Sequence, residues 1–136
     1  MQLSDLRRTI PNPDQRDPRT APIVSSAIEV HRQLGPGLLE SAYEEALCHE
    51  LHSRGLCFQR QVHLPLVYKG IRLDCGYQID LLVENEVLVE LKAVESVLPV
   101  HEAQLLTYMR LAHKTVGLLI NFNVPALRQG IIRRVL

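Results

Sequence analysis

Hydrophobic residues recur along this chain with two different periods. A spacing of three to four residues predicts helices over residues 23–34, 39–54 and 99–113. Alternating or continuous apolar stretches predict strands, which are expected at residues 57–68, 71–83, 87–93, 116–122 and 131–136. Pro65 interrupts the first of these strands and predicts a bulge or an edge there. The elements follow one another in the order ααβββαββ, which predicts a fold of the α/β (α+β) class.

The first 20 residues differ in composition from the rest of the chain. They contain three prolines among many polar residues, which predicts an extended N-terminal arm over residues 1–20. Residues 21–136 are expected to form one domain, because a chain of 136 residues suffices for a single core but not for two. Hydrophobic residues make up 46% of the chain, as in a globular protein.

The most informative pattern lies in a hairpin predicted between residues 78 and 92. Apolar residues occupy alternate positions of each strand, namely Ile79, Leu81 and Val83 on the first and Val87, Val89 and Leu91 on the second. Both apolar faces are buried together only if Glu84-Asn85-Glu86 forms the turn. That register places Asp80 directly across from Glu90, with Cβ atoms about 4.5–5.5 Å apart. It also places Gln78 opposite Lys92.

Two carboxylates that face each other among apolar residues destabilise a sheet unless a cation neutralises them. Oxygen ligands from neighbouring strands suit a hard divalent ion such as Mg²⁺. Lys92 shares the face of Glu90, because strand side chains repeat every two residues, and its ammonium could offset charge on a phosphoryl group. The alternative is an exposed sheet edge that carries an ordinary Glu–Lys pair.

Other polar residues are weaker candidates. His101, Gln104 and Tyr108 form one stripe of the third helix, which could face the carboxylates and bind a phosphate or orient Lys92. Tyr108 could equally pack in the core with its hydroxyl satisfied. Glu40 in the first turn of the second helix is explained by the helix dipole alone. A zinc site at Cys48, His49 and His52 lacks two ligands of matching spacing.

Charge and cysteine content limit the possible partners and the cellular compartment. The chain has 15 basic and 15 acidic residues, so no overall positive charge indicates nucleic-acid binding. The three cysteines do not indicate a disulfide framework. Because there is neither an apolar run near 18 residues nor an N-terminal leader, we expect a soluble cytoplasmic protein that makes no contact with a membrane.

The sequence resembles the bacterial GxxExxY family from about residue 22 to 134. The resemblance rests on Gly37-Leu38-Leu39-Glu40-Ser41-Ala42-Tyr43, Leu64-Pro65-Leu66, Tyr68-Lys69-Gly70, Gly76-Tyr77-Gln78-Ile79-Asp80, Val89-Glu90-Leu91-Lys92-Ala93, the segment from His101 to Tyr108, and the segment from Gly117 to Phe122. This family is similar to a compact branch of the PD-(D/E)XK nuclease superfamily. A restriction-endonuclease-like core, with a mixed central sheet flanked by helices, is therefore expected for residues 21–136.

The resemblance also implies roles for individual residues. Asp80 and Glu90, with the Leu91 carbonyl, would hold Mg²⁺, for which Mn²⁺ could substitute, and Lys92 would be the active-site lysine. Gln104 and Tyr108 match the Q-x-x-x-Y signature of the helicase-linked exonuclease branch. Glu40 would be the helix carboxylate that approaches the metal site. Gln78 replaces an arginine common in the family, which removes a charge but no metal ligand.

Two functions follow from these features. The first is a Mg²⁺-dependent nuclease, an enzyme that hydrolyses phosphodiester bonds in nucleic acid, for which DNA is the expected substrate. The second is a non-catalytic module of the same fold that docks a partner protein or nucleic acid, which the zero net charge and small size favour. A hydrolase acting on another phosphate substrate stays open. A homodimer would help so small a domain to cover a duplex.

Overall fold

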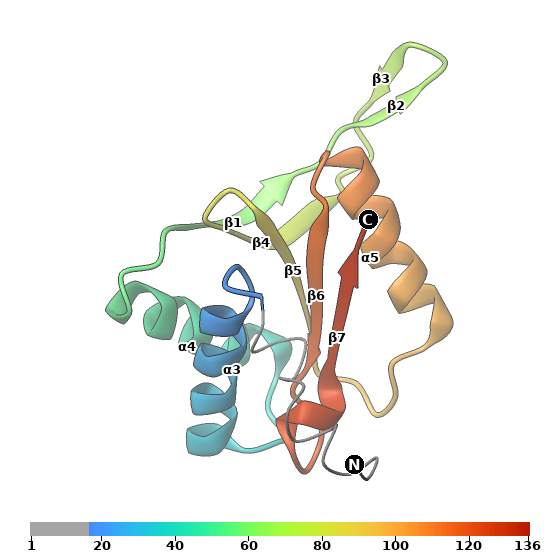
Figure 1. Cartoon of the computed structure of the whole chain (residues 1–136). Coiled ribbons are helices and arrows are strands. Elements are labelled where there is room, and N and C mark those ends of the chain that lie inside the picture. The colour runs from blue at the N-terminus through green and yellow to red at the C-terminus, as the bar shows by residue number, and fades with distance from the viewer. Residues whose placement is uncertain (1–16) are drawn as a thin grey trace, which may run out of the picture.

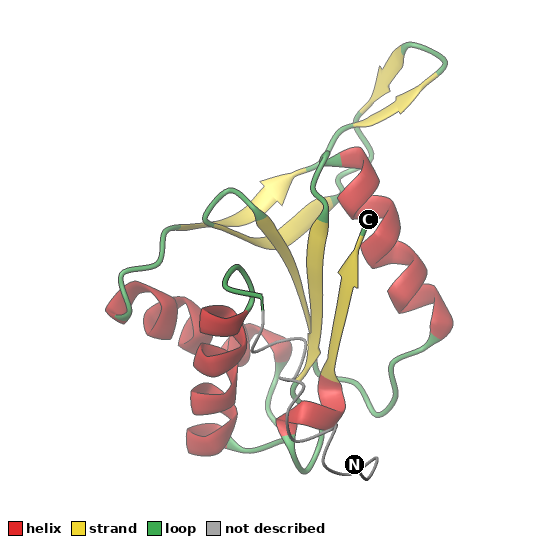
Figure 2. Ribbon diagram, in the orientation of Figure 1, coloured by secondary structure: helices red, strands yellow, loops and turns green. Residues whose placement is uncertain are grey.

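The computed structural model describes residues 17–136 as two helical layers around one sheet. The helices are α3 (Ala21–Leu34), α4 (Glu40–Ser53), α5 (Pro99–Leu111) and the short 3-10 helix η1 (Leu127–Gly130). The strands are β1 (Phe58–His63), β2 (Leu66–Tyr68), β3 (Ile71–Leu73), β4 (Gln78–Val83), β5 (Val87–Lys92), β6 (Val116–Asn121) and β7 (Ile131–Val135). Helices α3 and α4 cover one face of the sheet and α5 covers the other (Figures 1 and 2).

The central sheet has five strands in the order β1-β4-β5-β6-β7. Only the β5–β6 pair is parallel, and the other three pairs are antiparallel. A parallel pair needs a long crossover connection, and α5 supplies it. The expected mixed sheet flanked by helices is confirmed, and the architecture is that of a restriction-endonuclease-like fold.

Two of the predicted strands are each interrupted. The stretch at 71–83 was expected to be one strand, and the stretch at 57–68 was expected to be one strand with a bulge or an edge at Pro65. Instead, β2 and β3 leave the central sheet and form a separate hairpin that projects from the body (Figure 1). Pro65 has no N–H to donate to a ladder, and Gly76 adopts a φ of +75°, which favours glycine. A hydrogen bond of 2.9 Å from the Leu64 N–H to the Tyr77 carbonyl closes the base of this excursion.

The predicted register of the β4–β5 hairpin is confirmed by the Leu81–Val89 and Val83–Val87 pairs. The predicted position of Ile79 is wrong. Ile79 packs beneath α5 with Leu88, whereas Leu81 packs beneath α3 and α4. The two residues lie on either side of an irregular position of the β1–β4 pair, where Gln61 of β1 has a φ of +49° and lies between the residues paired with Leu81 and with Ile79.

Each face of the sheet has its own apolar core. Beneath α3 and α4, the cluster includes Tyr43, Leu47, Leu51, Leu81, Val83, Val87, Val89, Leu91, Leu118, Ile120 and Phe122. Beneath α5, it consists of Leu64, Ile79, Leu88, Leu105, Tyr108, Met109 and Leu119. Since β5 contributes Val87, Val89 and Leu91 to the first core, Glu90 and Lys92 alternate with them and belong to the α5 side.

The beginning of the described chain is attached to the last strand. Residues 1–16 of the predicted arm lie outside the described residues, and residues 17–20 form a turn before α3. The buried carboxylate of Asp17 forms ion pairs with Arg19 and with Arg133 of β7. The division of the chain at residue 20 stays a prediction.

Candidate active site on strands β4 and β5

Asp80 and Glu90 meet where the pairing of β4 and β5 ends. The last paired residues are Leu81 and Val89. Beyond them, Asp80 Oδ2 accepts a hydrogen bond of 2.8 Å from the Leu91 N–H, and Glu90 Oε1 accepts one of 3.2 Å from the Asp80 N–H. The structure therefore brings the two predicted carboxylates together. The predicted pairing of Gln78 with Lys92 lies past the end of this ladder.

Glu90 is in an environment that disfavours its charge. The residue is 6% exposed. Burial, followed by the negative charge of Asp80, raises the pKa of Glu90 to about 8, and the positive charge of Lys92 opposes this rise. Near neutral pH the pair therefore needs a proton or a metal cation to offset its negative charge.

Lys92 is the last residue of β5, on the same side of the sheet as Glu90. Its charge lowers the pKa values of both Glu90 and Glu40, so its ammonium is close enough to influence both carboxyls. The Phe122 N–H donates a 2.9 Å hydrogen bond to the Lys92 carbonyl, which holds the end of β5 against β6. Lys92 is therefore a half-buried cation beside the acidic pair.

Asn121 fixes the backbone just after Lys92, and the sequence alone did not single it out. It is 2% exposed at the end of β6. Its Oδ1 accepts a hydrogen bond of 3.0 Å from the Val94 N–H, and its Nδ2 donates one of 2.9 Å to the Val94 carbonyl. The sequence feature that could have identified Asn121 was its position as a polar residue at the end of an apolar strand.

Glu40 reaches the site from the start of α4. The residue is exposed as a whole, but neighbouring atoms crowd its carboxyl, and this desolvation raises its pKa. The charge of Asp80 raises it further, and Lys92 opposes the rise. The structure therefore places Glu40 within electrostatic reach of the predicted catalytic residues, although on a different element.

Tyr43 positions the loop that leads to Glu40. It is fully buried and stacks on Phe122 with ring centroids 4.5 Å apart. Its hydroxyl donates a hydrogen bond of 2.6 Å to the Gly35 carbonyl and accepts one of 3.1 Å from the Leu38 N–H. Gly37, with a φ of +100°, makes the intervening turn. Glycine, glutamate and tyrosine of the G-x-x-E-x-x-Y motif thus have separate physical roles.

Gln61 and Glu44 also lie next to Asp80, and neither was predicted. Gln61 Nε2 donates a hydrogen bond of 2.6 Å to Glu44 Oε1 and a longer one of 3.4 Å to Asp80 Oδ1. Glu44 in turn forms an ion pair with Arg60. The spacing of Glu44 one helical turn after Glu40 was the only sequence signal for its location.

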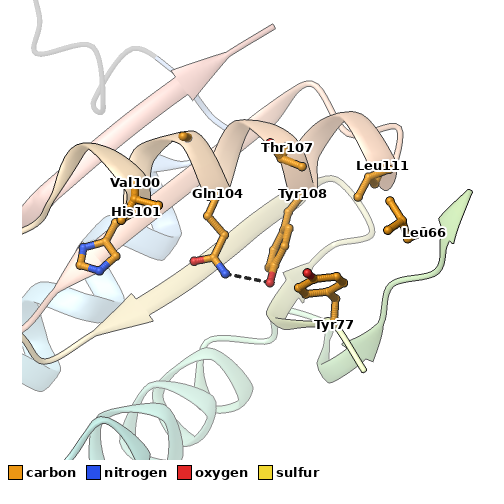
Figure 3. Close-up of a pocket in the computed structure, with 9 residues that line it drawn as sticks. Leu66, Tyr77, Val100, His101, Gln104, Thr107, Tyr108 and Leu111 are labelled. Atoms are coloured by element: carbon orange, nitrogen blue, oxygen red, sulfur yellow. Dashed lines mark hydrogen bonds between the residues drawn. The ribbon is translucent and has the colours of Figure 1, made fainter. Parts of the chain in front are cut away.

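The polar stripe of α5 is only partly directed at the carboxylates. Gln104 Nε2 donates a hydrogen bond of 2.8 Å to the Tyr108 hydroxyl (Figure 3). Burial raises the pKa of Tyr108, and the charges of Glu90 and Asp80 raise it further, so Tyr108 lies close to both acids. His101 instead caps its helix, because its Nδ1 accepts a hydrogen bond of 3.0 Å from the Leu98 N–H.

Comparison with known proteins identifies the family. The sequence model of the PD-(D/E)XK nuclease superfamily matches residues 17–135. The chain belongs to the PD-(D/E)XK nuclease superfamily. Neither the curated proteins nor the solved structures contain a match to it. Membership indicates a nuclease-type function with a nucleic-acid substrate.

Members of the PD-(D/E)XK superfamily generally use divalent metal ions such as Mg²⁺. The residues here fit such an ion, because two carboxylates converge and the buried one lacks a full counter-charge. In residues 17–136, no three His, Cys, Asp or Glu side chains form a metal-binding cluster. Two carboxylates are a donor set that a divalent ion which keeps several water ligands can use.

Two other features of this superfamily member bear on its partners. No helix within the described range has the length and apolar character needed to cross a membrane. A groove of about 430 Å³ lies between α5 and the segment before β4 (Figure 3). Tyr77, Gln104 and Tyr108 line it together with apolar residues, so two of the predicted site residues, Gln104 and Tyr108, form part of its wall.

Proposed function

We propose that this chain is a Mg²⁺-dependent nuclease of the GxxExxY type, which hydrolyses phosphodiester bonds in nucleic acid, and that its substrate is DNA. The observation that carries the proposal is the convergence of Asp80 and Glu90 at a break in the ladder, with Lys92 on the same face. An acidic pair with one buried carboxylate, which is short of positive charge and lies next to a lysine, is suited to a metal ion and a phosphate group.

In this proposal the metal ligands are Asp80, Glu90 and the Leu91 carbonyl. The Leu91 N–H points toward β4, where it meets the Asp80 carboxylate. A strand residue directs its N–H and C=O to the same neighbour in antiparallel pairing, so the Leu91 carbonyl faces the same side, beyond the end of the ladder. Mn²⁺, which also accepts oxygen ligands, is expected to substitute for Mg²⁺.

The remaining residues act on the phosphate and on its surroundings. When bound, Mg²⁺ supplies a Lewis acid that lowers the pKa of water and neutralises phosphate charge. Lys92 donates hydrogen bonds to the phosphoryl oxygens and stabilises the negative charge that they gain. Gln104 and Tyr108 orient the phosphate from the side of α5. Glu40 approaches from α4 and completes the acidic side of the site.

A cleavage assay with purified variants tests the proposal. Wild-type protein is incubated with single- and double-stranded DNA and RNA, with Mg²⁺, Mn²⁺ or EDTA. We expect cleavage that depends on the metal and is abolished in Asp80→Asn and Lys92→Ala. The amide introduced by Asp80→Asn keeps an oxygen that can accept the Leu91 N–H, so the fold should survive. Lys114→Ala is the matched control. It also removes a lysine, but the Lys114 ammonium binds the carbonyl of Asn85 in the β4–β5 turn, at 2.9 Å, and is not one of the proposed site residues. Undiminished cleavage by Asp80→Asn would refute the assignment.

One observation favours the second candidate, a non-catalytic binding module. Each carboxylate already accepts a backbone N–H, so the pair stabilises the ends of β4 and β5 even without a metal. The zero net charge also provides little attraction for a duplex. Calorimetric titration with Mg²⁺ and Mn²⁺ distinguishes the two candidates: metal binding with cleavage supports the nuclease, and absence of binding supports the module. Sedimentation velocity checks whether a homodimer forms.

A further inference from the structure

The groove is lined by an aromatic side chain, Tyr77, that the catalytic roles above do not use. Tyr77 is 42% exposed, and its ring meets the ring of Tyr108 edge to face, with centroids 5.9 Å apart. Its backbone is held firmly, because the Tyr77 carbonyl accepts a 2.9 Å hydrogen bond from the Leu64 N–H. Tyr77 therefore presents a solvent-accessible ring in the lining of the groove (Figure 3).

The rest of the groove has the chemistry of a site for a flat apolar ligand with a polar edge. Leu66 and Leu111 provide apolar walls, and Gln104 and Thr107 provide polar groups. Gln104 uses one N–H on the Tyr108 hydroxyl, and an amide side chain offers three further hydrogen-bonding positions. A nucleobase has this combination of an aromatic face and a hydrogen-bonding edge.

The location of the groove determines which base it would hold. Tyr108 lines the groove and packs in the same apolar cluster as Ile79, which directly precedes Asp80 on β4, and Tyr77 lines the groove two residues before Ile79. We propose that the groove binds one unpaired nucleobase of the substrate, on the nucleotide next to the phosphate held by the acidic pair. This inference rests on the proposed nuclease function and deepens it, since it names the substrate class.

That class is single-stranded nucleic acid or a frayed duplex end. A base within a duplex has both faces stacked and its edge paired, so it reaches a pocket only after it leaves the stack. Stacking on an aromatic side chain is tolerant of base identity, because every base has a π-face. The site should therefore select unpaired strands without selecting a sequence.

A binding assay tests the groove without requiring cleavage. Fluorescence anisotropy in EDTA compares a labelled oligothymidylate with an abasic oligomer of equal length, which keeps the phosphates and lacks the bases. Wild-type protein should bind the oligothymidylate about 5- to 150-fold more tightly, the range expected for one stacked base. Tyr77→Ala should remove this difference, and Tyr77→Phe should retain it.

Two further variants test whether the preference for the probe with bases arises in the groove. Ala103 lies on an exposed part of α5 and lines the groove, so Ala103→Trp should fill the groove and remove the preference for bases. Tyr68→Ala alters an exposed tyrosine of the projecting hairpin that is not part of the groove lining, and should leave the preference unchanged. Circular dichroism confirms that each variant is folded.

The outcomes separate this inference from the proposed function. The base site is refuted if wild type binds both probes equally or binds neither, if Tyr77→Ala keeps the preference, or if Tyr68→Ala loses it as well. None of these results affects the metal-dependent cleavage assay. Conversely, a chain that shows the base preference but never cleaves would keep the groove as a binding site and lose the nuclease proposal.

Discussion

Asp80 accepts a hydrogen bond of 2.8 Å from the backbone N–H of Leu91, at the level where a further strand pair would otherwise form. Glu90, the residue before Leu91, accepts the N–H of Asp80 in return. Each strand thus accepts a backbone N–H of the other strand with a carboxylate side chain in place of a backbone carbonyl. The consequence is that both carboxylates are oriented before any metal binds, which reduces the entropy lost on binding.

The raised pKa of Glu90 predicts an unusual dependence of stability on pH. Its folded-state pKa of about 8 exceeds the ordinary value of 4.5, so its stabilising contribution is complete below pH 4.5 and is lost as the pH rises through 8. Glu90→Gln should therefore raise the melting temperature of the metal-free protein by at least about 4 °C at pH 9, and much less at pH 5. Thermal melts in EDTA across this range measure the effect.

Metal addition provides the control for that experiment. Mg²⁺ at pH 9 should raise the melting temperature of wild type, because a cation offsets the ionised pair, and should have little effect on Glu90→Gln. A difference between the two proteins that does not change with pH would show that Glu90 is not the titrating group.

Removing one hydroxyl should test the role of Tyr43. Tyr43→Phe keeps the stacking on Phe122 but leaves the Gly35 carbonyl and the Leu38 N–H without their partner. We expect a loss of about 1–3 kcal/mol in the free energy of unfolding, measured by urea denaturation. Metal-dependent cleavage should also fall, because the loop before Glu40 is loosened. Tyr68→Phe, on the exposed hairpin, should change neither quantity.

Asn121 is expected to act on the site through the backbone beside Lys92. Asn121→Ala leaves both polar groups of Val94 unpaired and should cost about 1–3 kcal/mol of stability. The maximal cleavage rate should fall at a temperature where the variant is still folded. Asn123→Ala preserves the 3.2 Å hydrogen bond from the Asn123 N–H to Asn121 and is the matched control. Equal rates in both variants would exclude this positioning role.

Asp17 should make the fold sensitive to acid. The hydrogen bonds from Arg19, and then those from Arg133, hold the pKa of Asp17 well below its ordinary value of 3.8. Its stabilising contribution is therefore present above pH 3.8 and is lost as the pH falls toward the folded-state pKa. Asp17→Asn should lower the free energy of unfolding by about 1–3 kcal/mol at pH 7, and the difference should shrink below pH 3. A constant difference would contradict this assignment.

The central hairpin could be predicted because its determinants are local. Alternating apolar residues and a three-residue turn left one register that buries both faces, and that register implied the approach of Asp80 to Glu90. The positive φ of Gln61 was not predicted, and its hydrogen-bond partner Glu44 lies on a separate helix. Next to this position, Ile79 lies in the opposite core, against the prediction from alternation.

The sequence by itself determined the type and order of the main elements, the acidic pair and the adjacent lysine, because periodicity and turn residues act over a few positions. Only the tertiary structure decided which distant segments meet. The stacking of Tyr43 on Phe122, the attachment of Val94 to Asn121 and the groove between Tyr77 and α5 join residues far apart in the chain. Such contacts depend on how layers pack around a shared core, and no local pattern encodes that arrangement.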